Sequence, residues 1–101
     1  MIFVVDSNDR ERISEASEEL IRVSCECPEE TIILILANKQ DLSGAMSVEE
    51  ISTKLNVNSS IPQNRVWRLF GCSAITGEGL QEALHWIHEQ FNQDRNSKED
   101  P

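Results

Sequence analysis

The chain has 101 residues, of which 39% are hydrophobic and 27% charged, and it carries a formal net charge of −9. That length allows at most one small domain, and that composition is typical of a globular chain rather than a disordered one. The negative charge argues against a nucleic-acid partner, because the chain could not neutralise a row of phosphates. No apolar run approaches the roughly 20 residues of a membrane-spanning helix, and no signal-peptide pattern opens the chain.

The cysteines and histidines indicate neither a disulfide framework nor a metal site. Three cysteines are an odd number, and Cys25 and Cys27 are separated by one residue, unlike the C-x-x-C spacing of redox and zinc pairs. We interpret them as reduced thiols of a cytoplasmic protein. His85 and His88 lie three residues apart, but no third ligand is evident, so we expect no metal site.

The first half of the chain predicts a strand, a helix and a second strand. The β-branched apolar run at residues 1–6 indicates a buried strand. Asn8 and Glu11 resemble a capping box that would begin a helix there. Apolar residues then recur at helical spacing: Ile13, Ala16, Leu20 and Val23. Residues 31–37 form a continuous apolar run, as expected of a parallel strand covered on both faces.

The second half predicts a further helix, strand and helix. Ser47 and Glu50 form a capping box before a short amphipathic helix. We expect a polar loop at residues 56–64 and a third strand at 65–74, which is less apolar and therefore nearer an edge of the sheet. The predicted buried stripe of the last helix is Leu80, Leu84, Ile87 and Phe91.

The order of these elements predicts the fold class. Strands and helices alternate, which favours an α/β layer: a parallel three-stranded β-α-β-α-β-α arrangement with right-handed crossovers. We assign residues 1–92 to this domain and residues 93–101 to a polar tail that frays.

Polar side chains follow the second and third predicted strands, at the sheet edge where open parallel sheets bind ligands. Asn38, Lys39 and Asp41 follow the second strand. An Asp carboxylate can accept the two adjacent N–H groups of a guanine edge, which adenine does not offer. The stem of Lys39 can cover a base while its charge stays in water. The Asn38 amide suits either the purine N7 or the bracing of a neighbouring loop.

These residues carry a family resemblance. The stretches "IFVVDSNDRER", "LANKQDLSGAM" and "GCSAITGEGLQEAL", in this order, resemble the small GTPases of the ADP-ribosylation factor and factor-like (Arf/Arl) family over residues 1 to about 92. The resemblance implies that Asn38, Lys39 and Asp41 recognise the guanine base. Gln40 is the variable position of that motif.

The resemblance also implies roles for two further loops. Ser73, Ala74 and Ile75 match the second base-contacting loop, in which the Ala74 N–H would meet guanine O6. Residues 6–8 match a family signature, and we expect them to cap the following helix rather than to touch nucleotide.

The sequence lacks the motif that binds the phosphates of a nucleotide in GTPases. The sequence contains no Gly-Lys dipeptide and hence no G-x-x-x-x-G-K-[ST] loop. We therefore expect the C-terminal half of the domain only, a partial P-loop GTPase (Ras-like) fold without its N-terminal half. GTP or GDP would bind weakly or not at all, and Mg²⁺ would bind only in a full-length form.

For a full-length form, the resemblance implies a switch in vesicle and membrane traffic. Its partners would be exchange factors, GTPase-activating proteins and effectors, and it would lie in the cytoplasm or peripherally on the Golgi or other endomembranes. The alternative is a truncated, non-catalytic interaction module with little nucleotide binding.

Overall fold

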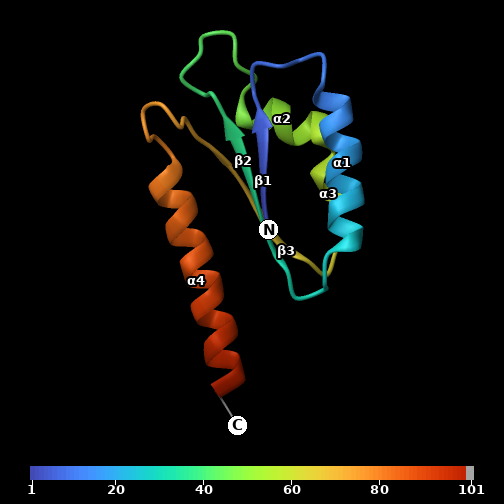
Figure 1. Cartoon of the computed structure of the whole chain (residues 1–101), viewed down its shortest axis with the longest axis vertical. Helices are drawn as coiled ribbons and strands as arrows, with labels where there is room; N and C mark the ends of the chain where they lie inside the picture. The colour runs from blue at the N-terminus through green and yellow to red at the C-terminus, as the bar shows by residue number, and fades with distance from the viewer. Residues whose placement is uncertain (100–101) are drawn as a thin grey trace.

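The computed structural model describes the backbone of residues 1–99 and the side chains of residues 1–92. Within that range three strands alternate with helices (Figure 1). The elements are β1 (Ile2–Asp6), α1 (Ile13–Glu26), β2 (Ile32–Asn38), α2 (Val48–Leu55), α3 (Val57–Ser60), β3 (Val66–Gly71) and α4 (Leu80–Glu99). The predicted α/β class is confirmed, and the arrangement is consistent with part of a Ras-like GTPase fold.

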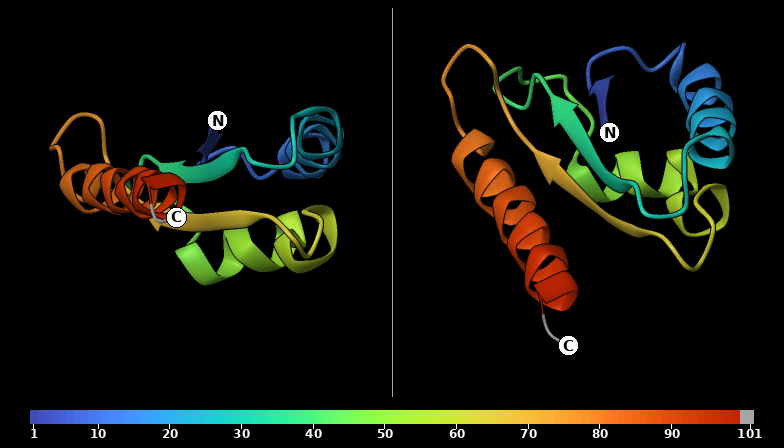
Figure 2. Two further views of the ribbon diagram at one scale, coloured as in Figure 1. Left: turned by 90° about the horizontal axis from the view of Figure 1, so that it is seen from below. Right: turned by 60° about the horizontal axis from the view of Figure 1, so that its bottom comes forward.

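The three strands form one parallel sheet in the order β1-β2-β3, with β2 in the centre. In register, Ile2 pairs with Leu34 and Ile33 pairs with Trp67. Helices α1, α2 and α3 cover one face of the sheet and α4 covers the other (Figure 2). The carboxyl ends of all three strands therefore meet at one edge, the upper edge in Figure 1.

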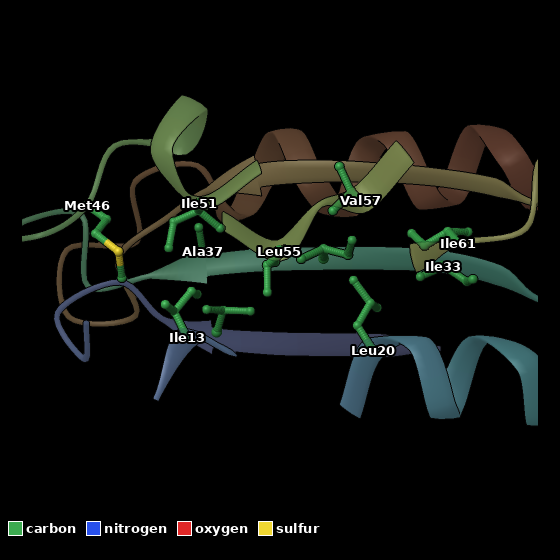
Figure 3. Packing of buried hydrophobic residues seen from close by; sticks show 11 residues of the cluster. Ile13, Leu20, Ile33, Ala37, Met46, Ile51, Leu55, Val57 and Ile61 are labelled. Atoms are coloured by element: carbon green, nitrogen blue, oxygen red, sulfur yellow. The ribbon is translucent and has the colours of Figure 1, made fainter. Parts of the chain in front are cut away.

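The larger core lies between the sheet and the first three helices (Figure 3). Leu20 of α1 and Ile33 of β2 are fully buried there, and each such side chain contributes about 1.5–3 kcal/mol of transfer free energy. A smaller cluster forms on the other face, where Ala83 and Trp86 of α4 pack on Leu34. The rings of Trp86 and Phe70 lie 6.1 Å apart and are tilted by 58°, a favourable aromatic geometry.

The start of α1 differs from the prediction. The helix begins at Ile13, and Arg12 precedes it without a side-chain cap, so the expected capping box at Asn8 and Glu11 is wrong. The backbone N–H of Asn8 instead donates to Asp6 Oδ1 at 2.9 Å. An aspartate that accepts from the N–H two residues ahead forms a local turn, and this turn competes with helix initiation at Asn8.

The region of α2 and α3 is partly as predicted. Ser47 Oγ accepts the N–H of Glu50 at 3.1 Å, which confirms the cap of α2. The predicted polar loop at 56–64 is wrong in part, because it contains the single-turn helix α3. This turn buries Val57, and the hydroxyl of Ser60 donates to the carbonyl of Leu55 at 2.8 Å.

The predicted buried face of α4 is wrong in part, because Ile87 packs against the cluster beneath the helix but two other residues of the stripe do not. Leu84 is 60% exposed and Phe91 is 59% exposed, whereas Ala83 and Trp86 form the buried face. The broad Trp86 ring, which packs on Leu34 and beside Phe70, turns this face of the helix toward the sheet. Helix α4 continues to Glu99, through part of the range 93–101 assigned to a polar tail; residues 100–101 lie outside the described part, and that division stays a prediction.

Candidate functional site

Three loops converge at the carboxyl edge of the sheet. They follow Asp6 of β1, Asn38 of β2 and Gly71 of β3. The parallel register aligns the last two residues of β1 with those of β2 and the last residue of β3 with Ala37. The sequence-predicted site residues lie in the second and third of these loops.

Asn38 joins the two predicted base loops. Its Oδ1 accepts the backbone N–H of Ala74 at 3.0 Å and lies 3.9 Å from the Cys72 thiol. This is the bracing of a neighbouring loop that the amide chemistry allows. Because Oδ1 is used internally, Nδ2 is the atom that could donate to a ligand. The Ala74 N–H is not free in this arrangement, so its predicted contact with guanine O6 would require this bond to be shared or exchanged.

The Asp41 carboxylate is oriented by Ser73. The hydroxyl of Ser73 donates to Asp41 Oδ1 at 2.8 Å, and it accepts the N–H of Thr76 at 3.2 Å. Ser73 is only 1% exposed, whereas Asp41 is exposed. A buried hydroxyl with two partners has one preferred direction. The hydrogen bond from Ser73 therefore holds the accessible carboxylate of Asp41 in a defined orientation.

Lys39 is held in an uncommon conformation beside β1. Its φ is +68°, in the left-handed region that non-glycine residues seldom occupy. Its Nζ lies 2.8 Å from Asp6 Oδ2. The bond to Asp6 raises the pKa of Lys39, and the bonds from Lys39 and from the Asn8 N–H lower the pKa of Asp6. Both groups are therefore charged across the neutral pH range.

The signature at residues 6–8 does not cap a helix, contrary to our expectation. Asp6 binds Lys39 instead, and Ser7 is fully buried and accepts a hydrogen bond from the side chain of Gln40 at 2.8 Å. Sequence reasoning missed the roles of Ser7 and Gln40. The available signal was a small polar residue directly after an apolar strand, opposite a polar residue within a ligand motif. The strand itself was expected to be buried, but Ile2 and Val4 of β1 are each 59% exposed.

The loop after β3 is shaped by glycine. Gly79 has a φ of +81°, and a Cβ there would lie 2.1 Å from the carbonyl oxygen of Gly71. Only glycine permits so close an approach of the start of α4 to the end of β3. The same loop leaves Ile75 86% exposed. Hydrogen bonds thus join four of the predicted site residues in two pairs, Asn38 with Ala74 and Asp41 with Ser73. Lys39 is bonded to Asp6 instead, and Ile75 is exposed.

A comparison with protein families decides the assignment. The model of the Arf family, described as the ADP-ribosylation factor family, matches residues 1–91. The chain belongs to the Arf family. Arf proteins are small GTPases, so the polar strand-end loops described above lie in a protein of a GTP-binding family.

Metal-ligating side chains do not cluster in the part of the chain that the structure describes. Among the described residues, no group of three or more His, Cys, Asp or Glu side chains converges on a point where an ion could sit. Over the same residues, no helix combines the length and the apolar character needed to cross a bilayer.

Proposed function

We propose that this chain recognises the guanine base of GTP and GDP, as the base-binding portion of an Arf-type GTPase switch. The observation that carries the proposal is the exposed Asp41 carboxylate, held at 2.8 Å by the buried Ser73 hydroxyl beside Asn38 and Lys39. A fixed carboxylate is the group that discriminates a base with two adjacent donors, because a wrong base leaves it unpaired.

Each residue of the proposed site has a distinct task. Asp41 accepts from guanine N1–H and the 2-amino group. Asn38 donates from Nδ2 to N7, since its Oδ1 is bonded to the Ala74 N–H. The stem of Lys39 covers the flat face of the base.

The loop after β3 closes the proposed base site. Ala74 provides a backbone N–H for O6, through exchange or sharing of its bond with Asn38. Ile75, which is 86% exposed, supplies an apolar flank.

Phosphate binding is outside this proposal. No G-x-x-x-x-G-K-[ST] loop occurs in the sequence, and such a loop cradles the phosphates in GTPases. We therefore expect weak nucleotide binding and no measurable GTP hydrolysis by this chain alone. A full-length form would bind Mg²⁺, exchange factors, GTPase-activating proteins and effectors, and would act in vesicle traffic on the Golgi or other endomembranes.

One observation favours the alternative, a non-catalytic interaction module. The base loops satisfy one another without a ligand: Lys39 is bonded to Asp6, and the Ala74 N–H is bonded to Asn38. A nucleotide must share or displace the bond of the Ala74 N–H. The two functions differ in whether the loops respond to guanine.

Base recognition is tested by replacing one hydrogen-bond acceptor of the Asp41 side chain with a donor. In Asp41→Asn, the amide can donate to the 2-oxo group of xanthine, so preference should move from GDP to xanthosine diphosphate by tenfold or more, about 1.4 kcal/mol. Nuclear magnetic resonance titration of the ¹⁵N-labelled chain measures the two weak affinities. The matched control is Asp9→Asn, an aspartate of the β1–α1 loop paired with Arg12. Unchanged selectivity in Asp41→Asn, or no response of wild type to GDP, would refute base recognition.

A further inference from the structure

Gln40 is the variable position of the base motif, yet its side chain makes two hydrogen bonds. Nε2 donates to Ser7 Oγ at 2.8 Å and to the carbonyl oxygen of Met46 at 2.9 Å. A carbonyl can only accept, so the amide nitrogen must face Met46. Ser7 and Met46 are both fully buried, and the Met46 N–H donates to the Ser7 carbonyl at 2.8 Å. Gln40 thus closes a small polar network beneath the site.

The backbone on either side of Lys39 is bonded to a different strand end. The carbonyl of Asn38 accepts the N–H of Ser7 at 3.1 Å, on the β1 side. The N–H of Gln40 donates to the carbonyl of Cys72 at 3.1 Å, on the β3 side. Lys39 crosses between these two attachments with its φ of +68°. The Gln40 side chain then returns to the β1 side and joins the two attachments.

The stem of Gln40 packs against the end of β3. A Cβ at Gly71 would lie 3.3 Å from Gln40 Cγ and 2.6 Å from Val48 Cγ2. A side chain at position 71 would therefore collide with Val48 and crowd the Gln40 stem, so glycine at the end of β3 favours this packing. Packing and the two hydrogen bonds together leave the half-buried side chain one arrangement.

From these contacts we propose that Gln40 is a positioning residue for base selectivity. It touches no nucleotide itself; it ties the loop of Asn38 and Asp41 to Ser7 and thereby holds Lys39 in its left-handed conformation. The relative positions of the Asn38 amide and the Asp41 carboxylate are thereby fixed. This inference rests on the proposed function, because selectivity has meaning only if the loop binds guanine.

The chemistry of the side chain makes the inference specific to an amide. Methionine has nearly the length of glutamine but no donor, so Gln40→Met would leave the Met46 carbonyl and Ser7 hydroxyl without this partner. A loop freed from the network can still approach a base but no longer presents both groups at a fixed separation. Contacts that need precise geometry, above all those of Asp41, weaken first.

The experiment compares GDP with inosine diphosphate, which lacks only the 2-amino group of guanine. The ratio of the two affinities reports the geometry of Asp41 and is insensitive to a general loss of binding. In Gln40→Met the preference of wild type for GDP should fall by about fivefold, the equivalent of one net hydrogen bond. Gln90→Met makes the same change at a half-buried glutamine late in α4 and should leave the ratio unchanged.

A second variant separates positioning from a loss of fold. Ser7→Ala removes one of the two acceptors of Gln40 and keeps the Met46 carbonyl, so it should lower the ratio less than Gln40→Met. The double variant should be no worse than Gln40→Met alone, because both changes act through one network.

The outcomes are distinct. A wild type without preference for GDP over inosine diphosphate overturns the proposed function and this inference with it. A wild-type preference that survives intact in Gln40→Met overturns only the inference. An equal loss of both affinities in Gln40→Met, with the ratio preserved, assigns Gln40 a purely structural role and likewise overturns it.

Discussion

The turn before α4 contains two glycines with the same backbone conformation and different surroundings. The φ angles are +82° at Gly77 and +81° at Gly79. A Cβ at Gly77 would meet nothing within 4 Å, whereas one at Gly79 would lie 2.1 Å from the carbonyl oxygen of Gly71. Both substitutions by alanine therefore share the cost of left-handed backbone, and only Gly79→Ala adds a collision with main-chain atoms.

The two costs can be estimated separately. Left-handed backbone at a residue with a Cβ costs about 1–2 kcal/mol, and this is the loss we expect for Gly77→Ala. Overpacking against atoms that cannot rotate away adds about 1–3 kcal/mol. Gly79→Ala should therefore lower the free energy of unfolding by about 2–5 kcal/mol, a large part of the roughly 5–15 kcal/mol typical of a domain.

Urea denaturation followed by circular dichroism measures both losses. Gly77→Ala is the matched control, because it differs from Gly79→Ala only in the collision. Equal losses in the two variants would refute the steric reasoning. A larger loss for Gly77→Ala would show that the turn is shaped differently.

Two further predictions concern the ion pair of the site and the face of α4. Asp6→Asn keeps the shape of the side chain and removes its charge beside Lys39, so wild type should exceed the variant in stability at neutral pH. Because the pKa of Asp6 is lowered from 3.8, this advantage should be complete above that value and vanish as the pH falls through the lowered pKa. Because the pKa of Lys39 is raised from 10.5, the advantage should also vanish in strong alkali, above that value. In urea denaturation, Leu20→Ala in α1 should lower the free energy of unfolding by about 2–5 kcal/mol. Leu84→Ala in α4 should lower it by less than about 0.5 kcal/mol.

Each of these predictions has a contrary result. An advantage of wild type over Asp6→Asn that persists unchanged at pH 2 would show that the charge of Asp6 is not its source. A loss in Leu84→Ala as large as that in Leu20→Ala would show that the stripe predicted from the sequence, and not the face led by Trp86, is the buried one.

The strands and their parallel sheet were predictable because β2 is apolar at nearly every position. Such a run is typical of a parallel strand covered on both faces, and its alternation with helices indicates an α/β sheet. The start of α1 was not predictable from local signals, because Asn8 can serve a cap or a turn equally well. The carboxylate of Asp6 decides between them by accepting the Asn8 N–H.

The candidate site was predicted as a set of residues but not as a network. The motif placed Asn38 and Asp41 in one loop, and the parallel sheet brought the loop of Ser73 beside them. The contacts of Gln40 with Ser7 depend on how β1 and β2 pair in register, which side-chain periodicity does not specify. The prediction of the buried face of α4 was wrong in part for a similar reason. Periodicity alone does not say which of two apolar stripes contacts the sheet.

The central place of β2 bears on how the chain folds. Among the described residues, β1 and β3 each pair only with β2. Both pairs are parallel, so a crossover connection joins the strands of each pair. Pairing Ile2 with Leu34 and Ile33 with Trp67 closes loops of similar length, and closure entropy grows only slowly with length. Loop-closure entropy therefore does not decide which of the two strand pairs forms first. The order of assembly depends instead on the packing that accompanies each crossover, and the helices of both crossovers contribute buried side chains to the same core cluster.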